Sequence, residues 1–188
     1  MLGEHTAVGI DMPVALAVRG RRQAEGELRA VLGSSARSVF TSPTRAAAEA
    51  RTQAEATACN RANDGPGISA QAFGLFASIR EVRTALRGSQ FNHWWETHPE
   101  TSFALMNGGQ PLASKRSALG VGQRLALLRV EFPAFDSVLS TAPASVPIDD
   151  VLDAAAAAWS ARRIGTGTAT LFGPDSRDDE GFALGIRI

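Results

Sequence analysis

Acidic residues stand at three points of the sequence where a strand or helix is expected to begin or end. These residues are Asp11, Glu96, Glu100, Asp150 and Asp153. Carboxylate oxygens are the ligands that Mg²⁺ and Mn²⁺ prefer, with one or two protein ligands to each ion and water or phosphate as the others. Two such ions can cleave a phosphodiester without a nucleophilic side chain. The acids therefore predict metal-dependent phosphodiester hydrolysis.

The same acids also fit a structural role. Asp11 could merely cap or solvate the end of a strand. Asp150 and Asp153 are three residues apart and share a helix face. Acids at the start of a helix also complement its dipole, without any metal. The residue types alone leave both interpretations open.

Two short strands are expected to position the first acids. The run Ala7-Val8-Gly9-Ile10 is too short and too uniformly apolar for an amphipathic helix, and it predicts a strand buried on both faces of a parallel sheet. Asp11 then lies at the carboxyl end, where ligands collect in open α/β sheets. A second strand is expected over 94–97, with Pro99 forcing a turn. An edge strand is expected over 184–188.

Helical spacing predicts the remaining elements. The segment 44–60 is expected to be a surface helix with Ser42 as its cap and Pro43 at its first position. A helix from Ser69 is expected to end at Gly88, and 135–146 is expected to be a connector. The other expected helices cover residues 19–32, 121–130 and 148–164.

Length and composition predict one α/β domain over residues 1–188. Apolar residues make up 44% and no window reaches the ~18 to 20 apolar residues of a membrane span, so no membrane contact and a cytoplasmic location are expected. Basic and acidic residues number 19 each, so nucleic acid could bind only through a local patch. The single cysteine, Cys59, excludes an internal disulfide and is expected to be structural.

Several short motifs occur in an order that resembles the family called domain of unknown function 429, which is regarded as a predicted nuclease of the ribonuclease-H-like superfamily. The motifs are Gly9-Ile10-Asp11-Met12-Pro13, Ser38-Val39-Phe40, Ser69-Ala70-Gln71-Ala72-Phe73-Gly74, Ile79-Arg80-Glu81-Val82, Glu96-Thr97-His98-Pro99-Glu100-Thr101-Ser102-Phe103, Asn107-Gly108-Gly109, Ser114-Lys115-Arg116 and Asp149-Asp150-Val151-Leu152-Asp153-Ala154. The last motif is also similar to the final helix of RuvC-like Holliday junction resolvases, where both aspartates serve the metal site.

The resemblance implies a ribonuclease-H-like mixed sheet flanked by helices. It places Asp11 at the end of the fourth strand, Glu96 and Glu100 at the fifth, and Asp150 or Asp153 on the last helix. The first-choice ligands for Mg²⁺ or Mn²⁺ are Asp11, Glu100 and Asp153. Glu96 and Asp150 are the second choices.

The resemblance also implies an N-terminal β-meander whose first strand carries a further aspartate, and only six residues precede Ala7. That meander is therefore expected to be missing. We consider three explanations: a start placed too far downstream, a homodimer formed through the open sheet edge, and a remnant that has lost activity.

Two further residues are candidates for substrate binding. Lys115 is the only lysine and could contact a phosphate, although a solvated loop lysine fits equally well. His98 could contact metal or phosphate, or could hydrogen-bond to backbone beside Pro99. The leading expectation is a metal-dependent nuclease. The alternatives are a non-catalytic binding or interaction module on the same scaffold, and a phosphate-handling enzyme of metabolism.

Overall fold

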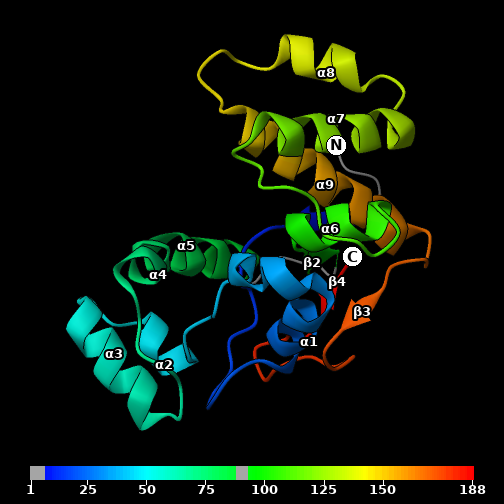
Figure 1. Ribbon diagram of the computed structural model, residues 1–188. Helices are drawn as coiled ribbons and strands as arrows, with labels where there is room; N and C mark the ends of the chain where they lie inside the picture. The colour runs from blue at the N-terminus through cyan, green and yellow to red at the C-terminus, as the bar shows by residue number, and fades with distance from the viewer. Residues whose placement is uncertain (1–6, 88–92) are drawn as a thin grey trace.

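A parallel pair of short strands lies at the centre of the computed structural model, which describes residues 7–87 and 93–188 (Figure 1). Strand β1 (Val8–Ile10) pairs with β2 (Trp94–Glu96), and Ile10 lies opposite Glu96. Both strands were predicted within one residue. The residues of β1 are only half-buried, however, so the expectation of burial on both faces was wrong. One face packs against a helix, where a Cβ on Gly9 would lie 2.6 Å from the carbonyl oxygen of Ala157.

A second, antiparallel pair consists of β3 (Leu171–Phe172) and β4 (Ile186–Arg187). The predicted strand over 184–188 is thus confirmed in part, and β4 packs beside β2. Within the described ranges the strands form two separate pairs and no larger mixed sheet. The fold is α/β and about 53% helical, with a small parallel sheet.

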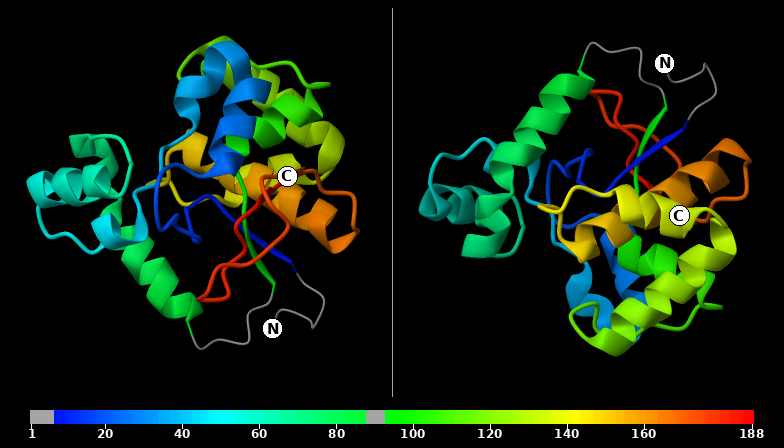
Figure 2. Two further views of the ribbon diagram at one scale, coloured as in Figure 1. Left: turned by 90° about the horizontal axis from the view of Figure 1, so that it is seen from below. Right: turned by 90° about the horizontal axis from the view of Figure 1, so that it is seen from above.

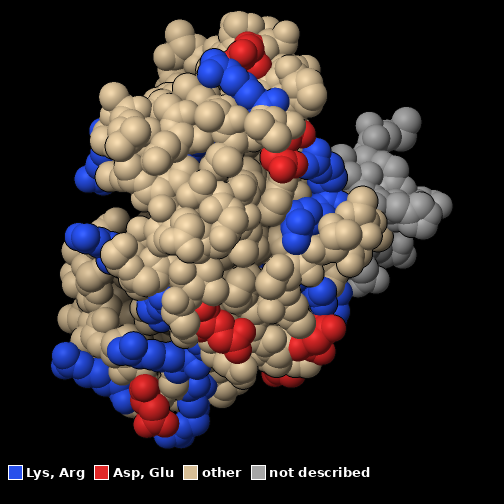
Figure 3. Space-filling view, turned by 45° about the vertical axis from the view of Figure 1, so that its right-hand side comes forward, with Lys and Arg blue, Asp and Glu red and all other residues tan. Residues whose placement is uncertain are grey.

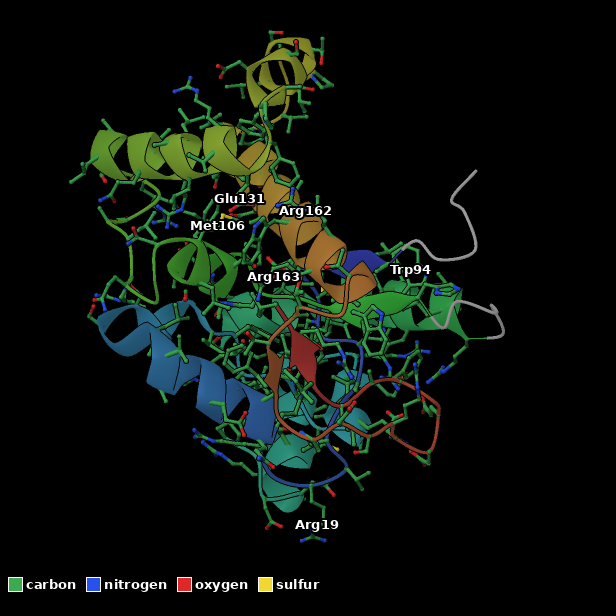
Figure 4. The ribbon with its side chains drawn as sticks, turned by 90° about the vertical axis from the view of Figure 1, so that its right-hand side faces the viewer. Arg19, Trp94, Met106, Glu131, Arg162 and Arg163 are labelled. Carbon is green, nitrogen blue, oxygen red and sulfur yellow. The ribbon has the colours of Figure 1, made fainter. Side chains whose placement is uncertain are left out.

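Four helices pack on one side of the parallel pair and supply most of the candidate site. The core that these helices share includes Phe103, Leu128, Leu152 and Ala156. Figure 4 shows Arg162 directed from the last of these helices toward Glu131, with which it forms an ion pair. The helices are α6 (Pro99–Met106), α7 (Ala118–Glu131), α8 (Phe135–Thr141) and α9 (Ile148–Gly165).

Four other helices form a lobe on the opposite side of the parallel pair (Figure 2). Leu16, Phe76 and Ile79 lie in the core of this lobe. Its helices are α2 (Arg45–Ala48), α3 (Gln53–Ala62), α4 (Ala70–Gly74) and α5 (Phe76–Leu86). Between the two groups, α1 (Gln23–Leu32) continues into the 3₁₀ helix η1 (Gly33–Ser38) and packs against α6 and β3.

The segment predicted as one surface helix over 44–60 differs from its prediction. It forms two helices, because Thr52 and Glu55 make a capping box that starts α3. Thr44, rather than Ser42, precedes α2, and Ala47 and Ala48 are fully buried. The predicted helix start at Ser69 is confirmed, since its hydroxyl caps α4 by accepting a hydrogen bond from the Ala72 N–H. The single helix predicted onward from Ser69 is wrong, because the chain divides at Leu75 into α4 and α5.

Two further expectations about the helices need correction, and one lies outside the described residues. Pro99 occupies the first position of α6 instead of forcing a turn. The expected connector over 135–146 contains α8. The predicted stop at Gly88 lies in the undescribed segment 88–92. No helix in the described part of the chain is long and apolar enough to cross a membrane.

Candidate active site

The parallel pair places Asp11 and Glu96 at the same sheet edge. Because Ile10 and Glu96 are register partners, Asp11 follows β1 where Thr97 follows β2, and the Thr97 N–H donates to the Ile10 carbonyl oxygen at 2.9 Å. The carboxyl ends of parallel strands meet at one edge. The chain therefore delivers two sequence-distant segments to one place.

Helices α6 and α9 bring Glu100 and Asp153 to this edge. Gly9 lets α9 lie directly against β1, since any side chain there would collide with the backbone of Ala157. A buried hydrogen bond of 2.8 Å between the hydroxyls of Ser102 and Ser160 joins α6 to α9. These contacts fix the spacing between the helices that carry the two carboxylates.

Two cations hold these carboxylates in place. The ammonium group of Lys115 lies 2.6 Å from Asp153 Oδ2 and 4.0 Å from Asp149 Oδ2. Arg124, a fully buried residue of α7, donates to Glu100 Oε2 at 2.5 Å and also to the carbonyl oxygen of Ala113. The loop before α7 is thereby anchored beside α9.

Gly120 explains how this loop reaches the site. A Cβ on Gly120 would lie 2.1 Å from the carbonyl oxygen of Ser114, so only glycine permits the close approach of the loop to the first turn of α7. Ser117 caps that helix by accepting from the Gly120 N–H at 3.0 Å. The backbone next to Lys115 is consequently well defined.

The carboxyl group of Asp11 has a strongly raised pKa. Desolvation by the surrounding protein, followed by the negative charges of Asp153 and Glu96, raises the pKa of Asp11 to about 7 from 3.8. The positive charge of Lys115 opposes this shift. Within residues 7–87 and 93–188 its carboxylate has no hydrogen-bond or ion-pair partner, although the residue reaches solvent. Its position is that of a carboxylate among like charges.

Only one of the two carboxylate oxygens of Asp153 has a hydrogen-bond partner. Its Oδ2 atom binds Lys115, but its Oδ1 atom is buried without a hydrogen-bond partner. Burial raises the pKa of Asp153, and Lys115 counteracts that effect. Burial alone would lower the pKa of Lys115, but its hydrogen bond and its attraction to Asp153 prevail and raise it. Lys115 is thus a charged partner.

Glu96 lies in a different, closed environment. It is 7% exposed and accepts hydrogen bonds from Arg22 Nη1 at 2.8 Å and from the Val14 N–H at 3.1 Å. Burial raises the pKa of Glu96, whereas Arg22 lowers it. Glu96 therefore forms a buried ion pair with Arg22 and does not contribute a free carboxylate to the site.

His98 and Asp150 are also placed by their neighbours. His98 caps α6: its Nδ1 atom accepts from the Thr101 N–H at 3.2 Å, and its Nε2 atom lies 3.4 Å from the Ser38 carbonyl oxygen. Burial lowers the pKa of His98. Asp150 lines an apolar groove with Phe135 and Val138, away from the acids at the sheet edge. The structure thus brings Asp11, Glu100, Asp153 and Lys115 together, but not Asp150.

Two residues of the site were missed in the sequence. Asp149 rather than Asp150 approaches Lys115, and helical geometry gives a signal for this, since residues four apart share a face more closely than residues three apart. Arg124 had no signal of its own, because its role depends on the position of α6. Helix α6 did have one: a proline after His98, with Glu100 in the first turn.

The donor set suits a hard divalent cation. In the described part of the chain, no three acidic, imidazole or thiol groups already meet at metal-ligand spacing. Mg²⁺, however, is usually held by one or two carboxylates, with water and phosphate completing its shell. The unpartnered Oδ1 atom of Asp153 and the unpaired carboxylate of Asp11 fit this requirement. A bound cation would offset both the desolvation and the like-charge repulsion that raise the pKa of Asp11.

A protein-family model matches most of the chain, whereas no curated protein and no solved structure matches it. The match is to a family model over residues 2–177, which includes every residue of the candidate site. The chain therefore belongs to the family described as "Protein of unknown function (DUF429)".

Proposed function

We propose that this protein is a metal-dependent nuclease that hydrolyses phosphodiesters. The observation that carries the proposal is the convergence of Asp11, Glu100 and Asp153 from β1, α6 and α9, with the unpaired Asp11 raised in pKa by its surroundings. Perturbed acids that converge in this way are typical of functional sites. The proposed fold is a ribonuclease-H-like domain.

The three acids have distinct proposed roles. Asp11 and Asp153 hold the cation, and Glu100, fixed by Arg124, completes the acidic side of the site. Mg²⁺ or Mn²⁺ would supply activation of water and stabilisation of the leaving oxygen. Lys115 orients Asp153 and places a positive charge beside the position of a phosphate.

A cleavage assay tests the proposal. Single- and double-stranded DNA and RNA, hybrids and junctions are incubated with Mg²⁺ or Mn²⁺, and cleavage is expected to fall by more than about 100-fold in Asp153→Asn. Asp136→Asn is the matched control. Asp136 is an exposed residue of α8 that pairs with Arg129 of α7, away from the site. Equal cleavage by Asp153→Asn and wild type would contradict the proposal.

A second candidate function is a non-catalytic binding module. The observation that favours it is that Lys115 and Arg124 already neutralise Asp153 and Glu100. Calorimetric titration with Mn²⁺ separates the two functions. Binding that is weakened in Asp11→Asn supports the nuclease, whereas a wild-type protein that binds no cation supports the module.

A further inference from the structure

A polar groove of about 730 Å³ opens beside the candidate site. One wall comes from η1 and from Gln71 of α4, and the other from the loop 112–116 with Glu100 and Arg124. Glu100 and Lys115 belong to both the site and the groove. A ligand lying in the groove would therefore pass next to the carboxylates.

The groove is lined by cations and hydroxyl groups. Arg37 and Arg116 are exposed, come from opposite walls, and have no side-chain partner among the described residues. Serines of η1 and of the 112–116 loop also line the groove. Arginine and serine are typical contacts of phosphate groups. The lining thus suits a chain that carries several phosphates.

No aromatic side chain of the described residues lines this groove. Proteins that hold single strands through their bases use aromatic stacking platforms. Without such a platform, the lining favours contacts to phosphate and sugar groups, which carry no base sequence directly.

The size and charge of the molecule favour one strand over two. The groove has the volume of a ligand pocket rather than of the broad surface that a duplex covers. On the face drawn in Figure 3, basic and acidic residues are interspersed around an uncharged central area. The sequence has 19 basic and 19 acidic residues, so positive charge acts only locally.

We infer that the groove between η1 and the 112–116 loop binds the sugar–phosphate backbone of a single-stranded nucleic acid, with Arg37 and Arg116 contacting phosphates on either side of the candidate site. The choice of a phosphodiester ligand rests on the proposed function. Arg37 and Arg116 are binding residues for substrate and act independently of the cation.

Binding is measured in EDTA, so that no cleavage occurs, by fluorescence anisotropy of a labelled oligothymidylate of about 12 nucleotides over a range of salt concentrations. Arg37→Ala and Arg116→Ala are each expected to weaken binding about fivefold or more. Each should also reduce the slope of log affinity against log salt by about 0.7, the value for one phosphate contact on a single strand. Arg51→Ala is the control, because Arg51 is exposed and does not line the groove.

Unchanged affinity and slope in both variants would overturn the inference. Equal or tighter binding of a duplex of the same length would overturn its single-strand specificity. Full competition by millimolar inorganic phosphate would show a one-phosphate site and would also overturn it.

The proposed function can fail separately. If groove-dependent binding occurs in EDTA but nothing is cleaved with Mg²⁺ or Mn²⁺, the inference holds and the nuclease proposal fails. If the protein cleaves and the groove variants cleave like wild type, the nuclease proposal holds and the inference fails.

Discussion

Two neighbouring groups of charged residues lie at the carboxyl end of the parallel pair, and their charge balance differs. In the buried group, Glu25 and Glu96 face Arg22 and Arg29. At the open edge, the carboxylates of Asp11, Glu100, Asp149 and Asp153 face only Lys115 and Arg124. The first group pairs each acid with an arginine, whereas the second has an excess of acids, and Asp11 has no partner in the described chain.

This difference separates acids that stabilise the fold from acids that are available for chemistry. Glu96 receives a guanidinium and a backbone N–H, which offset the cost of its burial. Asp11 is destabilised by desolvation and by like charges, and its pKa rises to about 7. A carboxylate that lowers the stability of the fold in this way is typical of a functional site.

The largest expected effect is the loss of stability when the ion pair between Arg22 and Glu96 is removed from the buried group. Arg22→Ala leaves the buried carboxylate of Glu96 without its counter-ion and should lower the free energy of unfolding by about 3–5 kcal/mol. Urea denaturation measures the loss, with exposed Arg116→Ala as a control that should change by less than about 0.5 kcal/mol. A loss for Arg22→Ala as small as that of the control would remove the distinction between the groups.

The second expected effect concerns cation binding at the open edge. Below pH 7 the carboxylate of Asp11 binds a proton, which competes with the cation for this ligand. The Mn²⁺ affinity should therefore fall about tenfold between pH 8 and pH 6. Calorimetry at the two pH values measures this change. In Asp11→Asn the affinity should be weaker and less dependent on pH. Wild-type affinity that is equal at both pH values would contradict the role of Asp11 as a ligand.

The smallest expected effect is a gain in stability. The pKa of Asp11 is raised in the folded state, so the folded protein binds more protons than the unfolded chain between about pH 4 and 7, and ionisation of Asp11 reduces stability as the pH rises through 7. Asp11→Asn should therefore be more stable than wild type at pH 8, by about 1 kcal/mol once solvent screening of this exposed group is allowed for. The difference should disappear near pH 4, as urea denaturation at both pH values will show. A less stable variant at pH 8 would place Asp11 among the acids that support the fold.

Much of the fold could be predicted because its signals are local. The apolar run before Asp11 identified β1, and the helical spacing after Ser69 identified the start of α4. Local signals were insufficient over 135–146, where α8 forms by packing Phe135 into the core shared with α7 and α9. Tertiary burial, rather than intrinsic preference, decided that helix.

The acids of the candidate site and Lys115 were the part that could be proposed from the sequence. Their residue types and positions at the ends of elements indicated a cluster, and the structure brings Asp11, Glu100 and Asp153 together. A backbone hydrogen bond of His98 was one of the two predicted roles, and the structure shows it, with the Thr101 N–H as a local donor. The role of Glu96 was not predictable, because it depends on a distant partner, Arg22. Hydrogen-bond partners far apart in sequence leave no local pattern.

The sequence by itself determined where carboxylates follow strands and begin helices, since strand and helix signals extend over a few neighbouring residues. Only the tertiary structure decided which carboxylates are neutralised. That outcome depends on which arginine or lysine a folded neighbour delivers, on close approaches such as those at Gly9 and Gly120, and on burial. Charge interactions act through space, so the unpaired state of Asp11 could be recognised only after folding.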